Sequence, residues 1–252
     1  MNSLELARGI CRLDAFLSEF GLRAQMECDL TRALVILDQL GVASTDAEGN
    51  QVYSTKLLHP ERSGLRNGEC FFLFLFDGPN VVGKIAARRD CLSNGDNWKT
   101  YGSRLLKALY PEDPAPVAAD RFPPITEQIT GNVTYAGDLY LRKGTYGGAP
   151  VRAFVLMLYY LVAAWWSVPD WLVCYVRARQ TENRSWMDGP WQFIPEALSF
   201  SHPPSATDRS TWMGYLDKPG FTSLLCQIDD VTSWSGRAEG SQIGRAPGPA
   251  AA

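Results

Sequence analysis

Residues 137–155 read GDLYLRKGTYGGAPVRAFV, and this stretch joins the end of an apolar strand to the start of an apolar helix. Apolar residues alternate imperfectly over 133–141, which predicts a strand, and a glycine-rich segment follows it. Pro150 suits the first position of a helix, because its missing N–H would lack an intrahelical partner there anyway. The apolar runs 151–166 and 171–176 predict a helix and a second strand. Such a unit normally joins two parallel strands, and its apolar composition predicts a place at the centre of the domain.

A second apolar unit lies upstream. Residues 70–76 read CFFLFLF and residues 81–87 read VVGKIAA, with the turn-forming sequence DGPN between them. This pattern predicts a β-hairpin made of two buried strands. The polar segment 90–101 is predicted as a loop and residues 101–110 as a short helix.

The two ends of the chain carry weaker patterns. Apolar residues spaced three or four apart predict two helices within residues 3–40, the first of them ending at Gly21. Near the other end, residues 180–200 suggest a short irregular helix. Residues 197–201 and 212–216 suggest a terminal pair of strands.

Taken together, these elements predict an α/β fold: a mixed, mostly antiparallel sheet with helices on both faces. We expect one domain over residues 1–230, with a helical N-terminal segment. Residues 111–124 hold five prolines and are expected to form an extended connection. Residues 231–252 are rich in Ser, Gly, Pro and Ala and are expected to form a disordered tail.

Composition argues against several classes of partner. The net charge is −3 and no basic stripe is present, so nucleic acid is not expected as the main partner. The six cysteines form no CxxC pair and the chain has two histidines, so a zinc site of standard spacing is not expected. Residues 1–20 are amphipathic and charged, unlike a cleavable signal peptide. A reducing cytoplasm is the simplest location for such a chain.

One segment raises the alternative of a membrane-associated protein. Residues 153–166 read AFVLMLYYLVAAWW and carry no charge. This run is shorter than the roughly 20 residues that a spanning helix needs. A helix buried on all sides within the protein is the preferred interpretation.

The glycine-rich segment RKGTYGGA, residues 142–149, is the best candidate for a binding site. A glycine-rich turn at the start of a helix can point several backbone N–H groups at one anion, and the helix N-terminus adds partial positive charge. Arg142 and Lys143 would add full charges. The alternative is a tight turn whose glycines serve only the backbone geometry.

At this point the chain resembles a known family. The segments CFFLFLFDGPNVVGKIAARRD (70–90) and GDLYLRKGTYGGAPVRAFV (137–155) are similar to the second to fourth strands, pyrophosphate loop and following helix of the GNAT superfamily. These proteins are acyl-CoA-dependent N-acyltransferases. The resemblance covers roughly residues 70–220. It implies the GNAT fold, acetyl-CoA or another acyl-CoA as co-substrate, and an amine as the acceptor.

The resemblance also implies site residues. In the family, exposed amides of the fourth strand pair with the pantetheine arm of CoA, and loop amides hold its pyrophosphate. Leu139 and Leu141 take the first role here, and the second falls to Gly144, Gly147, Gly148 and Ala149. Arg142 and Asn183 complete the candidate set, since Asn183 stands near the place of an asparagine that many family members carry after the fifth strand.

A general base is useful because an amine must lose a proton to form the amide. Asp138 is the best candidate, since it lies in an apolar strand, and Glu127 is a weaker one. The alternative for both is a solvated acid with no catalytic role.

A rival interpretation keeps the scaffold and drops the reaction. The family commonly uses a tyrosine after the asparagine to protonate the departing thiolate, and no tyrosine lies between Asn183 and Phe193. Gly144 stands where the family loop usually has arginine or glutamine. A non-catalytic binding or interaction module on a GNAT-like scaffold is therefore the alternative function.

Overall fold

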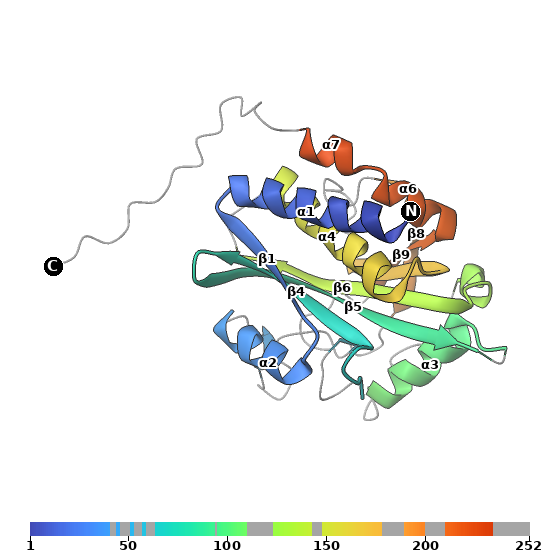
Figure 1. The fold of residues 1–252 in the computed structure, drawn as a ribbon. Helices are drawn as coiled ribbons and strands as arrows, with labels where there is room; N and C mark the ends of the chain where they lie inside the picture. Colours follow the sequence, from blue (N-terminus) through green and yellow to red (C-terminus); the bar gives the residue numbers. More distant parts are fainter. Residues whose placement is uncertain are drawn as a thin grey trace.

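A seven-stranded mixed sheet forms the centre of the protein (Figure 1). In the computed structural model, the described residues are 1–40, 44–45, 51–52, 57–58, 64–93, 95–109, 123–142, 148–177, 189–199 and 210–233. The sheet has the order β1-β4-β5-β6-β7-β9-β8. Within it, β6 and β7 run parallel, and the other neighbouring strands run antiparallel. The expected α/β fold with a mixed, mostly antiparallel sheet is confirmed.

The elements have the following bounds. The strands of the sheet are β1 (Leu22–Glu27), β4 (Cys70–Asp77), β5 (Asn80–Leu92), β6 (Gly131–Leu141), β7 (Trp171–Arg177), β8 (Gln192–Ser199) and β9 (Ser210–Asp217). A separate short ladder joins β2 (Ser44–Thr45) to β3 (Gln51–Val52). The helices are α1 (Ser3–Glu19), α2 (Leu30–Gln39), α3 (Trp98–Leu109), η2 (Pro124–Glu127), α4 (Ala149–Trp166), α6 (Lys218–Leu225) and α7 (Ile228–Thr232).

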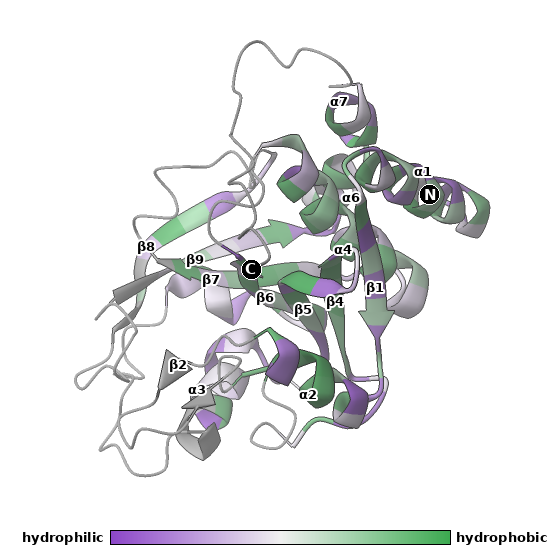
Figure 2. Cartoon of the chain, turned by 90° about the vertical axis from the view of Figure 1, so that its left-hand side faces the viewer, coloured by the Kyte–Doolittle hydropathy of each residue, from purple (hydrophilic) through white to green (hydrophobic). Residues whose placement is uncertain are grey.

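Helices cover both faces of the sheet, as expected (Figure 1). On one face, α4 lies against the sheet and is itself covered by α1, α6 and α7, and these elements share one hydrophobic core. On the other face, α2 and α3 share a second core with the alternate residues of the same strands. Figure 2 shows hydrophobic residues concentrated along the central strands, between these two layers.

Helix α4 is the buried helix that the sequence indicates. It is long and apolar enough to pass a length-and-composition test for a membrane span, but 78% of its 18-residue window is buried inside the protein. Helix α1 packs closely against α4 and buries part of its surface. Gly9 lies against the ring of Tyr160, whose hydroxyl donates a hydrogen bond to the carbonyl of Leu225 in α6. An apolar core helix therefore explains the segment without a bilayer.

Three expectations for individual segments were wrong. Residues 22–27 form the edge strand β1 and pair with β4, although the sequence pattern indicated only helices there. Residues 192–199 form the strand β8, where an irregular helix was expected, and β8 pairs with β9. Strand β5 continues to Leu92, into the segment predicted as a loop.

The remaining boundaries are close to expectation. The hairpin of β4 and β5, the strands β6 and β7 and the helix between them are confirmed. A terminal strand pair is present as expected, but Leu198 and Ser199 pair with Thr211 and Ser210, and it is residues 192–194 that pair within 212–216. Helix α7 extends the described structure to residue 233, and residues 111–122 and 234–252 lie outside the described ranges.

Candidate active site

The parallel strands β6 and β7 separate in the middle of the sheet. Their register pairs Val133 with Trp171, Thr134 with Leu172 and Tyr135 with Val173, and the described pairing ends there. Strand β6 continues for six more residues, from Ala136 to Leu141, along which its other edge stays paired with β5. One edge of a central strand is thus left without a strand neighbour among the described residues.

The alternation of a strand decides which amides face this open edge. The backbone N–H of Arg142 donates to the carbonyl of Val82 at 2.8 Å, so it points toward β5. Consecutive residues of a strand point their N–H groups to opposite sides, which directs the N–H groups of Leu139 and Leu141 away from β5. These are the two residues expected to pair with a pantetheine arm.

A β-bulge sets this orientation. Lys84 pairs with Tyr140 and Ala86 with Gly137, so three steps along β6 match two steps along β5. The inserted residue lies beside Asp138, whose φ of 60° is left-handed and uncommon for a residue other than glycine. Bulges of this kind re-aim a strand and recur next to active sites.

The side chain of Asp138 faces a buried lysine. The Nζ of Lys84 lies 3.5 Å from the Oδ2 of Asp138, and the two side chains are 6% and 4% exposed. Charges buried this deeply are costly to desolvate, so such groups are found paired with an opposite charge. The sequence indicates Asp138 as a candidate base but gives no sign of Lys84.

Helix α4 begins next to the open edge. Its N-cap, Gly148, has φ 62° and ψ −126°, a conformation that favours glycine, and no side chain caps the helix. Pro150 lies in the first turn, as expected, and has no N–H to satisfy. Ala149 and Val151 are both less than a tenth exposed, so their side chains pack inward at the helix start. Backbone amides and a partial positive charge are features of every such helix start.

Some predicted site residues lie outside the described residues: Lys143, Gly144, Gly147 and Asn183. Of the others, Arg142 follows β6, and its guanidinium Nη2 donates to the carbonyl of Val81 at 3.2 Å. Glu127 lies at the surface in η2, where Lys99 donates to it at 2.8 Å. The structure therefore brings Asp138, Leu139 and Leu141 together on β6, and it positions Glu127 in a surface ion pair.

Aromatic side chains occupy the sheet face opposite α4 at the same point. The rings of Tyr135 and Tyr175 lie 5.8 Å apart on the two separating strands. The indole Nε1 of Trp98 donates to the hydroxyl of Tyr175 at 3.0 Å. Burial raises the pKa of Tyr175 above the usual range of a phenol. The phenol therefore stays protonated at physiological pH, and it lies on β7 just beyond the last parallel pair.

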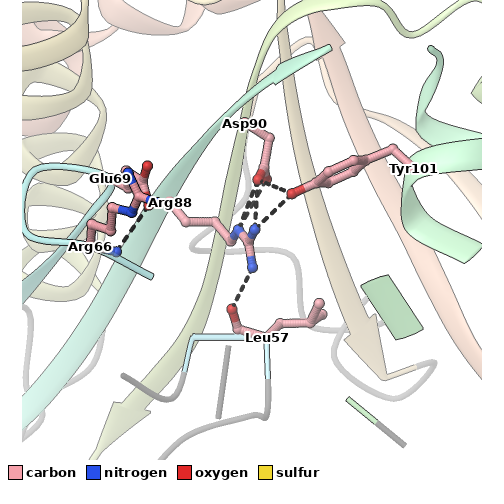
Figure 3. Close-up of polar contacts among 6 residues, drawn as sticks. All are labelled: Leu57, Arg66, Glu69, Arg88, Asp90 and Tyr101. Atoms are coloured by element: carbon pink, nitrogen blue, oxygen red, sulfur yellow. Dashed lines mark hydrogen bonds and ion pairs between the residues drawn. The ribbon is translucent and has the colours of Figure 1, made fainter. Parts of the chain in front are cut away.

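A second buried polar cluster lies farther along β5 (Figure 3). The guanidinium of Arg88 donates from Nε and Nη2 to the carboxylate of Asp90, at 3.0 and 2.6 Å. It also donates to the hydroxyl of Tyr101 at 2.9 Å and to the carbonyl of Leu57 at 3.0 Å. These hydrogen bonds join β5 to α3 and to the chain at Leu57, so they hold α3 and that segment against this face of the sheet.

Comparison with known proteins gives a fold likeness and no close relative. No protein-family profile matches the chain, and no curated protein matches it. FeeM, an N-acyl amino acid synthase from uncultured soil microbes, is 10% identical, with a TM-score of 0.44 over 83% of this chain and 97% of its own. MesI, a CoA-dependent acyl-homoserine lactone synthase, is 13% identical, with a TM-score of 0.43 over 86% and 100%.

An acetyltransferase of the GNAT family from Streptococcus pneumoniae is 7% identical, with a TM-score of 0.39 over 78% of this chain and 99% of its own. One of the matched structures is thus named as a member of the GNAT family. Sequence identities and TM-scores this low do not support any conclusion about activity. The chain's own geometry has to support its function.

Proposed function

We propose that this protein is an acyltransferase that moves an acyl group from acyl-CoA to an amine acceptor, with acetyl-CoA as the first donor to test. The observation that carries the proposal is the edge of β6, beside the start of α4, that has no strand neighbour in the part of the chain that the structure describes. The N–H groups of Leu139 and Leu141 face the side that β7 has left. A pantetheine arm carries amide groups and can pair with such an edge as an additional strand would.

The start of α4 supports the same proposal. The CoA pyrophosphate is an anion, and the N-terminus of a helix favours negative charge. Gly148 has no side chain that would stand between the helix amides and a phosphate. In the proposal, residues 144–149 hold the pyrophosphate while the β6 edge holds the arm that leads to the thioester.

The reaction needs positioning and two proton movements. The acceptor nitrogen attacks the thioester carbonyl, a C–N bond forms, the C–S bond breaks, and the acceptor's proton ends on the CoA sulfur. Holding the two reactants together supplies much of the rate enhancement. Asp138 is the carboxylate that we propose as the first acceptor of the amine proton, because it lies at the bulge beside the β6 edge.

The experiment is a calorimetric titration of the purified protein with acetyl-CoA and with free CoA, repeated on two variants. Gly148→Ala and Gly148→Glu share the backbone strain at a left-handed φ, and the glutamate adds bulk and a negative charge. We expect micromolar binding to the native protein, weaker binding to the alanine variant and no measurable binding to the glutamate variant.

Two results would contradict the proposal. Unchanged CoA binding by a folded Gly148→Glu variant would refute the pyrophosphate site. Failure of the folded native protein to bind either ligand would refute the acyltransferase and favour a non-catalytic interaction module on the same scaffold.

The proposed location is the reducing cytoplasm. All six cysteines are free thiols, and Cys70 and Cys174 are buried. A chain that folds with its thiols reduced suits that compartment. The acyl-CoA pool on which the proposed reaction depends is intracellular, which agrees with it.

A further inference from the structure

We infer that Lys84 is a positioning residue: through its buried ion pair with Asp138 it fixes the β6 bulge, and the bulge aims the amides of Leu139 and Leu141 at the acyl donor. The part of this inference that concerns the donor rests on the proposed function. The part that concerns the backbone does not.

The bulge determines which residues present their amides. With the inserted residue, Tyr140 pairs with Lys84 and the amide of Arg142 reaches Val82, so Leu139 and Leu141 face the open edge. Without it, the alternation would shift by one residue. The amides of Tyr140 and Arg142 would then face outward, and every side chain beyond Gly137 would change faces.

The shifted register would also disturb the packing. The side chain of Leu141 lies over Gly83, where an added Cβ would come within 2.6 Å of its Cδ2, and both Leu139 and Leu141 pack toward the α4 core. In the native register, the two residues whose amides face outward therefore also have partly buried side chains that pack against the α4 core. Loss of the bulge would move these leucines out of that core.

The bulge needs an element that holds it, because its backbone is not the preferred one. Asp138 has φ 60°, and residues other than glycine are strained in such conformations and persist there only where their surroundings fix them. An aspartate that is 4% exposed also needs a charged partner. The ammonium group of Lys84 lies 3.5 Å from this carboxylate. Lys84 is therefore a charged partner for Asp138 and also helps to hold its backbone in the left-handed conformation.

The position of Lys84 in β5 places it directly opposite the bulge in β6. Lys84 is the β5 residue at which the register shifts, and its cross-strand partner is Tyr140. A side chain at that position lies on the same face as the carboxylate that it holds. The pair therefore links the two strands at the bulge and acts on the backbone that carries both amides.

The test replaces both charges at once, so that neither is left buried alone. In Lys84→Met/Asp138→Asn the side chains keep similar sizes, and asparagine tolerates the left-handed conformation. Arg89→Met is the matched control, because Arg89 is an exposed cation on the same strand. Circular dichroism and urea unfolding establish that each variant is folded.

Amide hydrogen exchange measured by NMR is the first readout, and it needs no ligand. The amides of Tyr140 and Arg142 point toward β5 and report on the register. We expect both to exchange about tenfold faster or more in the double variant, since local opening lowers protection. The amides of residues 133–135 and the whole Arg89→Met protein should keep their native rates. Native exchange at Tyr140 and Arg142 in the folded double variant would overturn the inference.

CoA affinity is the second readout. The dissociation constant should rise about tenfold or more in the double variant, because small misplacement of binding groups has effects of that size. If Asp138 acted only as a base, its loss would lower kcat and leave CoA affinity and amide exchange unchanged, which would also overturn the inference. If the native protein does not bind CoA, the proposed function fails, and amide exchange alone decides the role of Lys84.

Discussion

Replacing Gly9 by alanine puts a methyl group into the ring of Tyr160, at the contact between α1 and α4. An ideal Cβ on Gly9 would lie 2.0 Å from Cε1 and 2.6 Å from Cδ1 of the tyrosine. The ring has little room to retreat, because Tyr160 is 3% exposed and its hydroxyl donates to the Leu225 carbonyl at 2.7 Å. The substitution must therefore move α1 or break that hydrogen bond.

Two effects of opposite sign decide the outcome. Alanine in a helix interior is favoured over glycine by about 1 kcal/mol. Overpacking a core costs about 1–3 kcal/mol, and loss of the Tyr160 hydrogen bond adds about 0.5–1.5 kcal/mol. We expect a net decrease of about 1–3 kcal/mol in the free energy of unfolding, so the clash outweighs the helix propensity.

Urea unfolding followed by circular dichroism measures this difference. Arg8→Ala, an exposed position on the same helix, is the control and should change the free energy of unfolding by less than about 0.5 kcal/mol. A Gly9→Ala protein as stable as the native one, or more stable, would refute the reasoning, because it would mean that α1 does not pack on Tyr160 at this distance.

The remaining predictions concern buried charge and buried thiols. Arg88→Met leaves the buried carboxylate of Asp90 without its cation and should lower the free energy of unfolding, measured in urea, by about 3–5 kcal/mol. A loss under about 1 kcal/mol would contradict the buried network. Burial raises the pKa of Cys70 and of Cys174 to about 12, so neither should react with a thiol reagent at pH 8 in the native state. Both thiols have a higher pKa in the folded protein than in the unfolded chain, so the unfolded chain loses these protons first as the pH rises. The free energy of unfolding should therefore fall as the pH rises from 9 toward 12 and should show no effect of these thiols below pH 9. Urea unfolding across that pH range measures the change. Fast labelling of Cys70 or Cys174 would contradict their burial. The exposed cysteines are the positive control and should react at once: Cys11, Cys91 and Cys226.

The sequence predicts the centre of the sheet well and its edges poorly. Strands β4, β5 and β6 have long apolar runs, because they are buried on both faces, and such runs are easily recognised. The two edge strands, β1 and β8, carry no such run. In β1 only Leu22 is buried among LRAQME, and β8 contains Pro195, which a strand tolerates at an edge or a bulge. The pairing of β8 with β9 shifts register between Ile194 and Leu198, which fits a proline at that place.

The end of β5 was missed for a different reason. Arg88 and Asp90 are polar residues of a kind that usually indicates a loop, yet both are buried in the strand. They satisfy each other's charge and bind Tyr101 and Leu57 from two other segments (Figure 3). Nothing in a single segment of the sequence predicts a partner so far along the chain.

The same limit applies to the candidate site. Gly148, Pro150 and the strand before them predict the loop and the helix start, because local backbone requirements select those residues. The bulge and its ion pair depend on the register between β5 and β6, which joins Lys84 to a residue 54 positions away. That pairing becomes visible only once the sheet is formed.

The measurement that tests the central claim most directly is the exchange of the Leu139 and Leu141 amides during a titration with acetyl-CoA, followed by NMR. The open edge of β6 predicts that both amides exchange fast in the free protein and become protected as the donor binds, while the amides of residues 133–135 stay protected throughout. Binding of acetyl-CoA that leaves Leu139 and Leu141 as fast as in the free protein would contradict the account, because the donor would then bind elsewhere than on this edge.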